Sequence, residues 1–265
     1  MKYIVDHDYH IHSYLSACAK DPEQTAERIV KYAKDHGLKS VCVTDHFWDR
    51  EAPYGVTENN PWQNWCYRQD YTHISQILPL PKDPEVEFLF GCETDMDMLD
   101  VIGLPKKNMD RFDFIIIAPS HLHMEGFGLK HGATLEEKAE VWVHKHETLL
   151  NMKLPFHKIG LAHMIFSTKV TNLIPDDTFR RIFTKAAEVG VGIEMNFGVP
   201  SADASEEAKR DLRRPYILAK ECGCKFYLGS DTHQAKFLDS GYNKLCDMVD
   251  FLGFEESDKF ILKKD

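Results

Sequence analysis

The chain has 265 residues, of which 43% are hydrophobic and 28% charged, and its net charge is −10 with fourteen histidines counted as neutral. This composition is that of a globular protein, so it excludes a chain that is disordered throughout, and the length suits one barrel-sized domain. The acidic balance disfavours nucleic acid as a partner, because a negatively charged surface repels phosphate backbones.

The N-terminal sequence MKYIVDHDYHIH lacks the long apolar stretch of a signal peptide, and no apolar run approaches the length of a membrane span. The seven cysteines are scattered. The nearest pair, Cys222 and Cys224, has C-x-C spacing, which differs from the C-x-x-C of redox and zinc motifs. We therefore expect reduced thiols, a cytoplasmic location and no membrane contact.

The chain begins with a strand pattern at residues 4–9, followed by a helical pattern. Asp21 and Pro22 resemble an N-cap with proline in the first helical position. Apolar residues then recur at helical spacing over residues 26–33, and Gly37 suits the end of that helix. A second strand is predicted at residues 41–43.

The following segment, residues 49–84, has no regular pattern and contains several prolines. It is typical of a long excursion with some helix. Trp62 and Trp65 within it either form a wall of a substrate pocket or pack the excursion against the domain, and the sequence leaves both alternatives open.

From residue 86 onward, strand and helix patterns alternate. Strands are predicted at residues 86–90, 114–118, 159–162, 191–195 and 226–228, and helices at residues 134–151, 176–189 and 206–221. This alternation indicates a parallel sheet, and about seven strands form either a barrel or an open doubly wound sheet. In both folds, functional side chains lie at the C-terminal ends of the strands. No linker divides the chain, so we expect a single domain over residues 1–265.

Residues of metal-ligand type occur at or after every predicted strand end. His10 and His12 end the first strand, and they share one face because they are two residues apart. The later strand ends carry Asp45 and His46, Glu93, His121 and His123, His163, Glu194 and Asn196, and Asp231 and His233. A single histidine at a strand end is more often a structural residue, but independent placement would not concentrate so many on one side of a sheet. Imidazole and carboxylate suit zinc, manganese or iron, and the number of ligands indicates two or three divalent transition metals.

Together these residues resemble the PHP (polymerase and histidinol phosphatase) superfamily. The resemblance depends on H-x-H at 10 and 12, T-D-H at 44–46, Glu93, Ser-His at 120–121, His163 and G-S-D-x-H at 229–233. Their order and strand-end positions match over most of the chain. The resemblance implies an α/β fold, a distorted (β/α)7 barrel, which agrees with the strand count.

The resemblance also implies how the ligands divide among the metals. The first metal is held by His10, His12, Glu93 and Asp231, the second by Glu93, His121 and His163, and the third by His46 and His233. Glu93 bridges the first two metals, whose separation in such sites is roughly 3.5–4 Å. His121 fits the family motif, so we expect His123 to line the pocket and contact substrate instead.

Position 18 departs from the family pattern. The remaining ligand of the third metal is commonly a histidine at this position, six residues after the second histidine of H-x-H, and here it is Cys18. A thiolate binds zinc, so we expect Cys18 to be a ligand with an altered metal preference. The alternatives are an ordinary buried thiol, or a nucleophile, which would need an oriented histidine partner that the ligand set does not leave free.

The resemblance implies a metal-dependent phosphoesterase that hydrolyses a small phosphorylated metabolite, with histidinol phosphate as one candidate. Bound metals would neutralise the phosphoryl group and lower the pKa of a bound water to about 7, giving hydroxide as the nucleophile. Glu93 is the central catalytic residue of this scheme. Asp45 or a histidine outside the ligand set is expected to protonate the leaving alkoxide. Arg214 is a candidate phosphate contact, although paired arginines on a polar helix are usually solvated.

Two alternatives stay open. One is a different metallohydrolase of amidohydrolase type, and the other is a non-catalytic metal-binding regulatory protein. The sixth strand end bears on the substrate. Histidinol phosphatases of the family often continue Glu-x-Asn with a segment of small residues, glycine and arginine, but residues 194–200 read EMNFGVP. This difference weakens the assignment to histidinol phosphate and leaves the metal chemistry unaffected.

Overall fold

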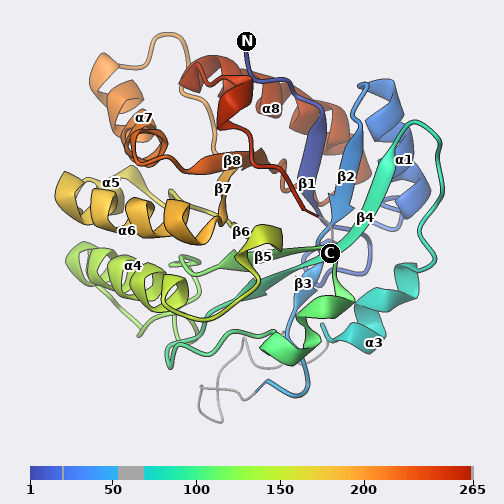
Figure 1. Cartoon of the computed structure of the whole chain (residues 1–265), viewed down its shortest axis with the longest axis horizontal. Coiled ribbons are helices and arrows are strands. Elements are labelled where there is room, and N and C mark those ends of the chain that lie inside the picture. The colour runs from blue at the N-terminus through green and yellow to red at the C-terminus, as the bar shows by residue number, and fades with distance from the viewer. Residues whose placement is uncertain (20, 53–68, 264–265) are drawn as a thin grey trace.

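The computed structural model describes residues 1–19, 21–52 and 69–263, and in them parallel strands form a nearly closed barrel with helices around its outside (Figure 1). The strands are β1 (His7–Ile11), β2 (Ser40–Val43), β3 (His46–Phe47), β4 (Glu87–Asp95), β5 (Phe114–Ala118), β6 (Ile159–Leu161), β7 (Gly192–Met195) and β8 (Lys225–Leu228). Neighbours follow the order β1-β2-β4-β5-β6-β7-β8, and the short β3 pairs with β4. The predicted barrel of seven principal strands is confirmed.

The barrel closes along a seam between β1 and the segment that follows β8. The amide of Asp231 donates to the carbonyl of His10 at 2.7 Å, and the amide of His12 donates to the carbonyl of Thr232 at 3.1 Å. The buried Asp8 carboxylate accepts from the Ser230 amide at 2.9 Å on the same seam. The first and last strand ends therefore place their polar side chains next to one another.

The helices cover the barrel and end in residues that suit their termini. They are α1 (Ala26–Asp35), α3 (Tyr71–Ile74), α4 (Leu135–Leu150), α5 (Thr168–Thr171), α6 (Asp176–Val189), α7 (Glu206–Glu221) and α8 (Leu238–Leu252). Short 3₁₀ helices lie at Ser75–Ile77, Lys106–Arg111, Phe156–Lys158, Ala235–Phe237 and Glu256–Asp258. Thr134 closes a capping box at the start of α4, and Gly37 follows α1 with φ of 69°, a conformation that favours glycine.

Several local predictions are wrong, and the first of them is the start of β1, which lies at His7 and not at Ile4. The helix α1 begins at Ala26 with Thr25 as its N-cap, because Asp21 accepts from the Glu23 amide in a separate turn. The strand β4 continues to Asp95, so Glu93 lies within the strand and not after it. The helix α8 has no counterpart among the predicted elements. Trp62 and Trp65 lie outside the described residues.

Apolar side chains fill the barrel interior below the strand ends. Phe114 of β5 and Tyr227 of β8 meet edge to face with ring centroids 5.1 Å apart, although their strands are not neighbours. Gly160 of β6 gives this space, because a Cβ there would overlap the Tyr227 ring. A packed interior leaves the C-terminal strand ends as the place for a site. Among the described residues, no helix combines the length and apolar character that crossing a membrane requires. A cytoplasmic location stays a prediction.

Candidate metal centre

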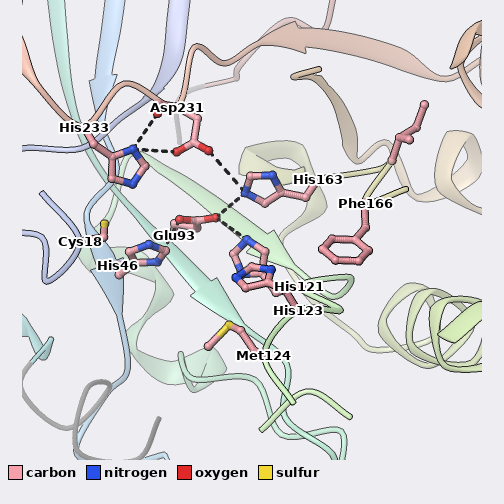
Figure 2. A pocket seen from close by; sticks show the side chains of 11 residues that line it. Cys18, His46, Glu93, His121, His123, Met124, His163, Phe166, Asp231 and His233 are labelled. Carbon is pink, nitrogen blue, oxygen red and sulfur yellow. Dashed lines mark hydrogen bonds and ion pairs between the residues drawn. The ribbon is translucent and has the colours of Figure 1, made fainter. Parts of the chain in front are cut away.

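Glu93 lies at the centre of the cluster formed by the strand ends (Figure 2). Nitrogens of five histidines surround its two carboxylate oxygens at 3.0–3.6 Å: His46, His12 and His10 at Oε2, and His163 and His121 at Oε1. Asp231 joins them, with Oδ1 3.1 Å from His12 Nε2. Glu93 Oε2 is buried and has no hydrogen-bond partner among the described residues. Five imidazoles that converge on one buried carboxylate fit ligands arranged around ions.

Four histidine rings of the site are held through Nδ1 by a carboxylate, a hydroxyl or a backbone carbonyl. The Nδ1 partners are Glu194 for His10 at 2.5 Å, Ser16 for His12 at 3.1 Å, Asp95 for His121 at 2.5 Å and the Asp231 carbonyl for His233 at 2.7 Å. A bond at Nδ1 leaves Nε2 as the ligand atom and sets the ring orientation. The residues present therefore fit a metal cluster in their chemistry and their orientation.

The ligand atoms fall into groups whose members all lie within 4.8 Å of one another. These groups are His10, His12 and Asp231; Glu93, His121 and His163; His12, Cys18, His46 and His233; and His10, His163 and Glu194. The first three resemble the three predicted ligand sets. Their roles as ligands stay predictions.

The electrostatics of the cluster favour a cation. Burial would raise the pKa of Glu93, but the nearby His46 and His10 hold it well below its usual value. Burial would lower the pKa of His12, but bonds with Asp231 and Glu93 outweigh burial and raise it to about 9. The buried Glu93 carboxylate thus stays ionised, and its negative charge favours the protonated, positively charged form of His12. Bound metal ions supply the same compensation.

Glu194 is a second buried carboxylate that orders the site from below. Its Oε1 holds the His10 ring, and its Oε2 accepts from the His163 backbone amide at 3.1 Å. Gly229 leaves room for it, because a Cβ there would overlap the Glu194 carboxylate and lie 2.7 Å from His10 Cβ. The glycine of the G-S-D-x-H motif is therefore required by close packing.

Two site residues have left-handed backbones, with φ of 54° at His163 and 57° at Asp231. This region is uncommon for residues other than glycine and costs about 1–3 kcal/mol. One turn directs His163 toward Glu93, with Nε2 at 3.1 Å from Oε1, and the other directs Asp231 toward His12, with Oδ1 at 3.1 Å from Nε2. Strain of this kind is typical of functional sites.

A pocket of about 420 Å³ opens over the cluster. Its lining includes Cys18, His46, Glu93, His121, His123, Met124, His163, Ile165, Phe166, Asp231 and His233. The His123 ring stacks on Phe166 with centroids 5.8 Å apart and planes inclined by 16°. Figure 2 shows Phe166 on the side away from Cys18, beyond His121 and His163. One side of the pocket thus carries ligand atoms, and the other is an apolar wall.

The structure does not bring two predicted residues to this pocket. The Asp45 carboxylate is buried, and both of its oxygens accept hydrogen bonds from Ser13. The Ser13 amide donates to one oxygen and the Ser13 hydroxyl to the other, each at 2.6 Å. Arg214 of α7 donates to the carbonyls of Thr171 and Ile174 and to Asp176, so it joins helices on the outside of the barrel. Asp45 therefore holds the turn after β1 in place, and Arg214 holds α7 against the segment that contains α5 and the start of α6.

Asp95 and Ser16 hold ligand histidines but are not among the residues predicted from the sequence. Asp95 had a usable signal, because it stands two residues after Glu93 and therefore shares its strand face once β4 is extended. Ser16 and Phe166 carry no signal in sequence, since their position depends on loops that tertiary contacts arrange.

A family model described as PHP domain matches residues 8–198, which excludes Asp231 and His233. Solved structures with a similar fold include histidinol phosphate phosphatase from Lactococcus lactis, complexed with zinc, L-histidinol and phosphate. It is 18% identical, with 97% of this chain and 98% of that chain covered and a TM-score of 0.58. A Listeria monocytogenes protein assigned as a histidinol phosphatase is 14% identical, with 91% and 100% covered and a TM-score of 0.61. These similarities show the fold. No curated protein sequence matches the chain.

Proposed function

The chain belongs to the PHP domain family and is a metal-dependent hydrolase, and we propose that it releases phosphate from a small phosphomonoester. The observation that carries the proposal is Glu93, whose buried carboxylate has five imidazoles around it and a free oxygen among the described residues. A carboxylate in this setting suits a bridging ligand between two metal ions.

We assign the metal positions by the groups of converging ligand atoms. The first is held by His10, His12, Glu93 and Asp231, the second by Glu93, His121 and His163, and the third by His46, His233 and Cys18. When bound, zinc, manganese or iron supplies Lewis-acid neutralisation of the phosphoryl group and activation of water. Glu194 and Asp95 hold the His10 and His121 rings in position for this work.

The opposite wall would receive the leaving alcohol. Met124, Ile165 and Phe166 make it apolar, and among the described residues no lysine or arginine lines the pocket. Recognition of phosphate would therefore depend on the metals. His123 lines the pocket but belongs to none of the ligand groups, so we assign it contact with the leaving group. An alcohol with a planar ring fits beside the stacked His123 and Phe166.

The test is a panel of phosphomonoesters assayed with metal-free protein and after addition of zinc, manganese or iron. The panel includes histidinol phosphate, because a protein of similar fold is complexed with L-histidinol and phosphate. It also includes aryl, nucleoside and sugar phosphates. We expect turnover only with metal and higher kcat/KM for ring-bearing alcohols.

Amide substrates and the variant Glu93→Ala serve as controls. Loss of metal content and of turnover in Glu93→Ala is expected, because the bridging carboxylate is removed. Turnover of amides without turnover of esters would favour the amidohydrolase alternative, and metal binding without any turnover would favour a regulatory protein. Full phosphatase activity in metal-free protein would overturn the proposal.

A further inference from the structure

Cys18 lies at one side of the cluster, next to His46 and across Glu93 from His121 and His163 (Figure 2). Its sulfur lines the pocket, and it lies within 4.8 Å of ligand atoms of His12, His46 and His233. The Nδ1 of His46 is in turn 3.0 Å from Glu93 Oε2, the buried oxygen without a hydrogen-bond partner among the described residues. The thiol is thus one corner of a group of donor atoms.

The turn that carries Cys18 is held in place from several directions. Asp45 binds Ser13 at its start. Ser16 Oγ lies 3.1 Å from His12 Nδ1 and 3.2 Å from Cys18 Sγ, and it accepts from the His46 amide at 3.4 Å. One hydroxyl therefore contacts the cysteine and two neighbouring histidines, which positions the sulfur before any ion binds.

Further contacts anchor the turn to Gln69 and to α3. The Ala17 amide donates to Gln69 Oε1 at 3.0 Å, and His73 Nε2 donates to the Leu15 carbonyl at 2.7 Å. These bonds fix the backbone on the N-terminal side of Cys18.

From these contacts we propose that the Cys18 thiolate is a ligand of the third metal, with His46 and His233, and that this position selects zinc over manganese. The proposal rests on the proposed function, because the position belongs to the same cluster. Sulfur is a soft ligand, and a site of one thiolate and two imidazoles suits zinc, whereas manganese prefers oxygen ligands. The first and second positions, with carboxylate and imidazole only, lack this discrimination.

The test uses cobalt as a spectroscopic substitute for zinc, with metal content measured on the same samples. The wild-type protein is loaded with cobalt, zinc or manganese and freed of excess metal. We expect a sulfur-to-cobalt charge-transfer band in the near ultraviolet, and one more equivalent of zinc than of manganese per chain. Cys18→Ser should lose the band and that equivalent. Cys18→His should keep the equivalent without the band and bind manganese better.

Cys222→Ser is the matched control, because Cys222 follows α7 and its sulfur faces the Arg180 carbonyl. It should keep both the band and the metal content. A band that persists in Cys18→Ser, or its absence from wild-type protein loaded with three equivalents, overturns the proposal. Because no substrate is present, the spectrum is independent of the phosphatase assay. If the wild-type protein bound no cobalt at all, the result would count against the metal cluster of the proposed function, and not only against Cys18 as a ligand.

Discussion

Single residues outside the ligand sets decide which nitrogen each histidine presents. Asp95 is the clearest case, because its Oδ1 lies 2.5 Å from His121 Nδ1, while His121 Nε2 lies 3.6 Å from Glu93. Burial would lower the pKa of His121, but Asp95 outweighs burial and raises it to about 9. The same carboxylate that orients the ring therefore strengthens it as a ligand.

We predict that Asp95→Asn lowers metal affinity or kcat by about 10–100-fold, the usual effect of removing such a partner. Metal titration and steady-state kinetics measure it, with the fold preserved by circular dichroism. Asp100→Asn is the control, because Asp100 also binds a histidine, His144 at 2.8 Å, but neither residue lines the pocket. Equal losses in both variants would show that Asp95 has no special role.

At the scale of elements, regular patterns predicted the fold well. The strand β5 and the helices α6 and α7 have the predicted bounds, because β5 is a continuous apolar run and the two helices have apolar residues at helical spacing. The helix α8 was missed because glycine, serine and aspartate interrupt its sequence, and tertiary packing of Leu245 and Met248 outweighs that weak propensity.

The convergence of the candidate ligands was also predictable from the sequence, whereas their binding of metal stays a prediction. Strand ends located the ligand types, because parallel strands end on one side of a barrel. Which groups converge depends on the seam and on the left-handed turns at His163 and Asp231, which no local pattern reports. The Asp45 hydrogen bonds to Ser13 likewise depend on tertiary contact.

The packing after β8 gives a second prediction. Gly229→Ala should lower the free energy of unfolding by about 1–3 kcal/mol, the usual cost of overpacking, and should displace Glu194 from His10. Chemical denaturation and metal content report the two effects. Gly198→Ala, where an added Cβ meets nothing within 4 Å, should change neither. Unchanged metal content in Gly229→Ala would contradict the assigned role of Glu194.

A third prediction concerns Asp6, which joins the start of β1 to the C-terminal segment. Burial would raise its pKa, but bonds with His7 and Lys259 outweigh burial and lower it to about 2. A carboxylate with a lowered pKa stabilises the fold above its unfolded pKa, about 4, and this contribution disappears as the pH falls toward 2. Asp6→Asn should therefore cost about 1 kcal/mol from pH 7 to 5, after discounting for partial exposure, and progressively less below pH 4.

Urea denaturation across this pH range measures the difference between wild type and variant. Asp110→Asn is the control, because Asp110 is 89% exposed in its pair with Lys158, and such pairs contribute little. If the difference in unfolding free energy between wild type and Asp6→Asn grew as the pH fell, the stabilising role assigned to the ionised Asp6 carboxylate would be wrong.

At the scale of the whole molecule, the proposed first and third metal positions bridge the seam between β1 and β8. His10 and His12 lie on one side, and Asp231 and His233 on the other. Metal bound there connects strands that otherwise share few backbone hydrogen bonds. Ligands that bind only the folded state stabilise it by mass action.

Removal of metal should therefore lower the melting temperature and loosen the seam first. We expect faster hydrogen exchange at the His12 and Asp231 amides, which cross the seam, than at the Glu87 amide, which bonds Lys39 between β2 and β4. Exchange measured with and without a chelator tests this. A uniform acceleration at all three amides would mean that the metals stabilise the barrel as a whole.

The seam also has a consequence for biosynthesis. The proposed second position draws on Glu93, His121 and His163, so its ligands are all present once β6 has left the ribosome. The other two positions need Asp231 or His233 and must wait for the segment after β8. At that stage a nascent chain would contain every proposed ligand of the second position and only some of the ligands of the other two. Metal acquisition would proceed in a set order during translation, and the last ions would enter as the barrel closes.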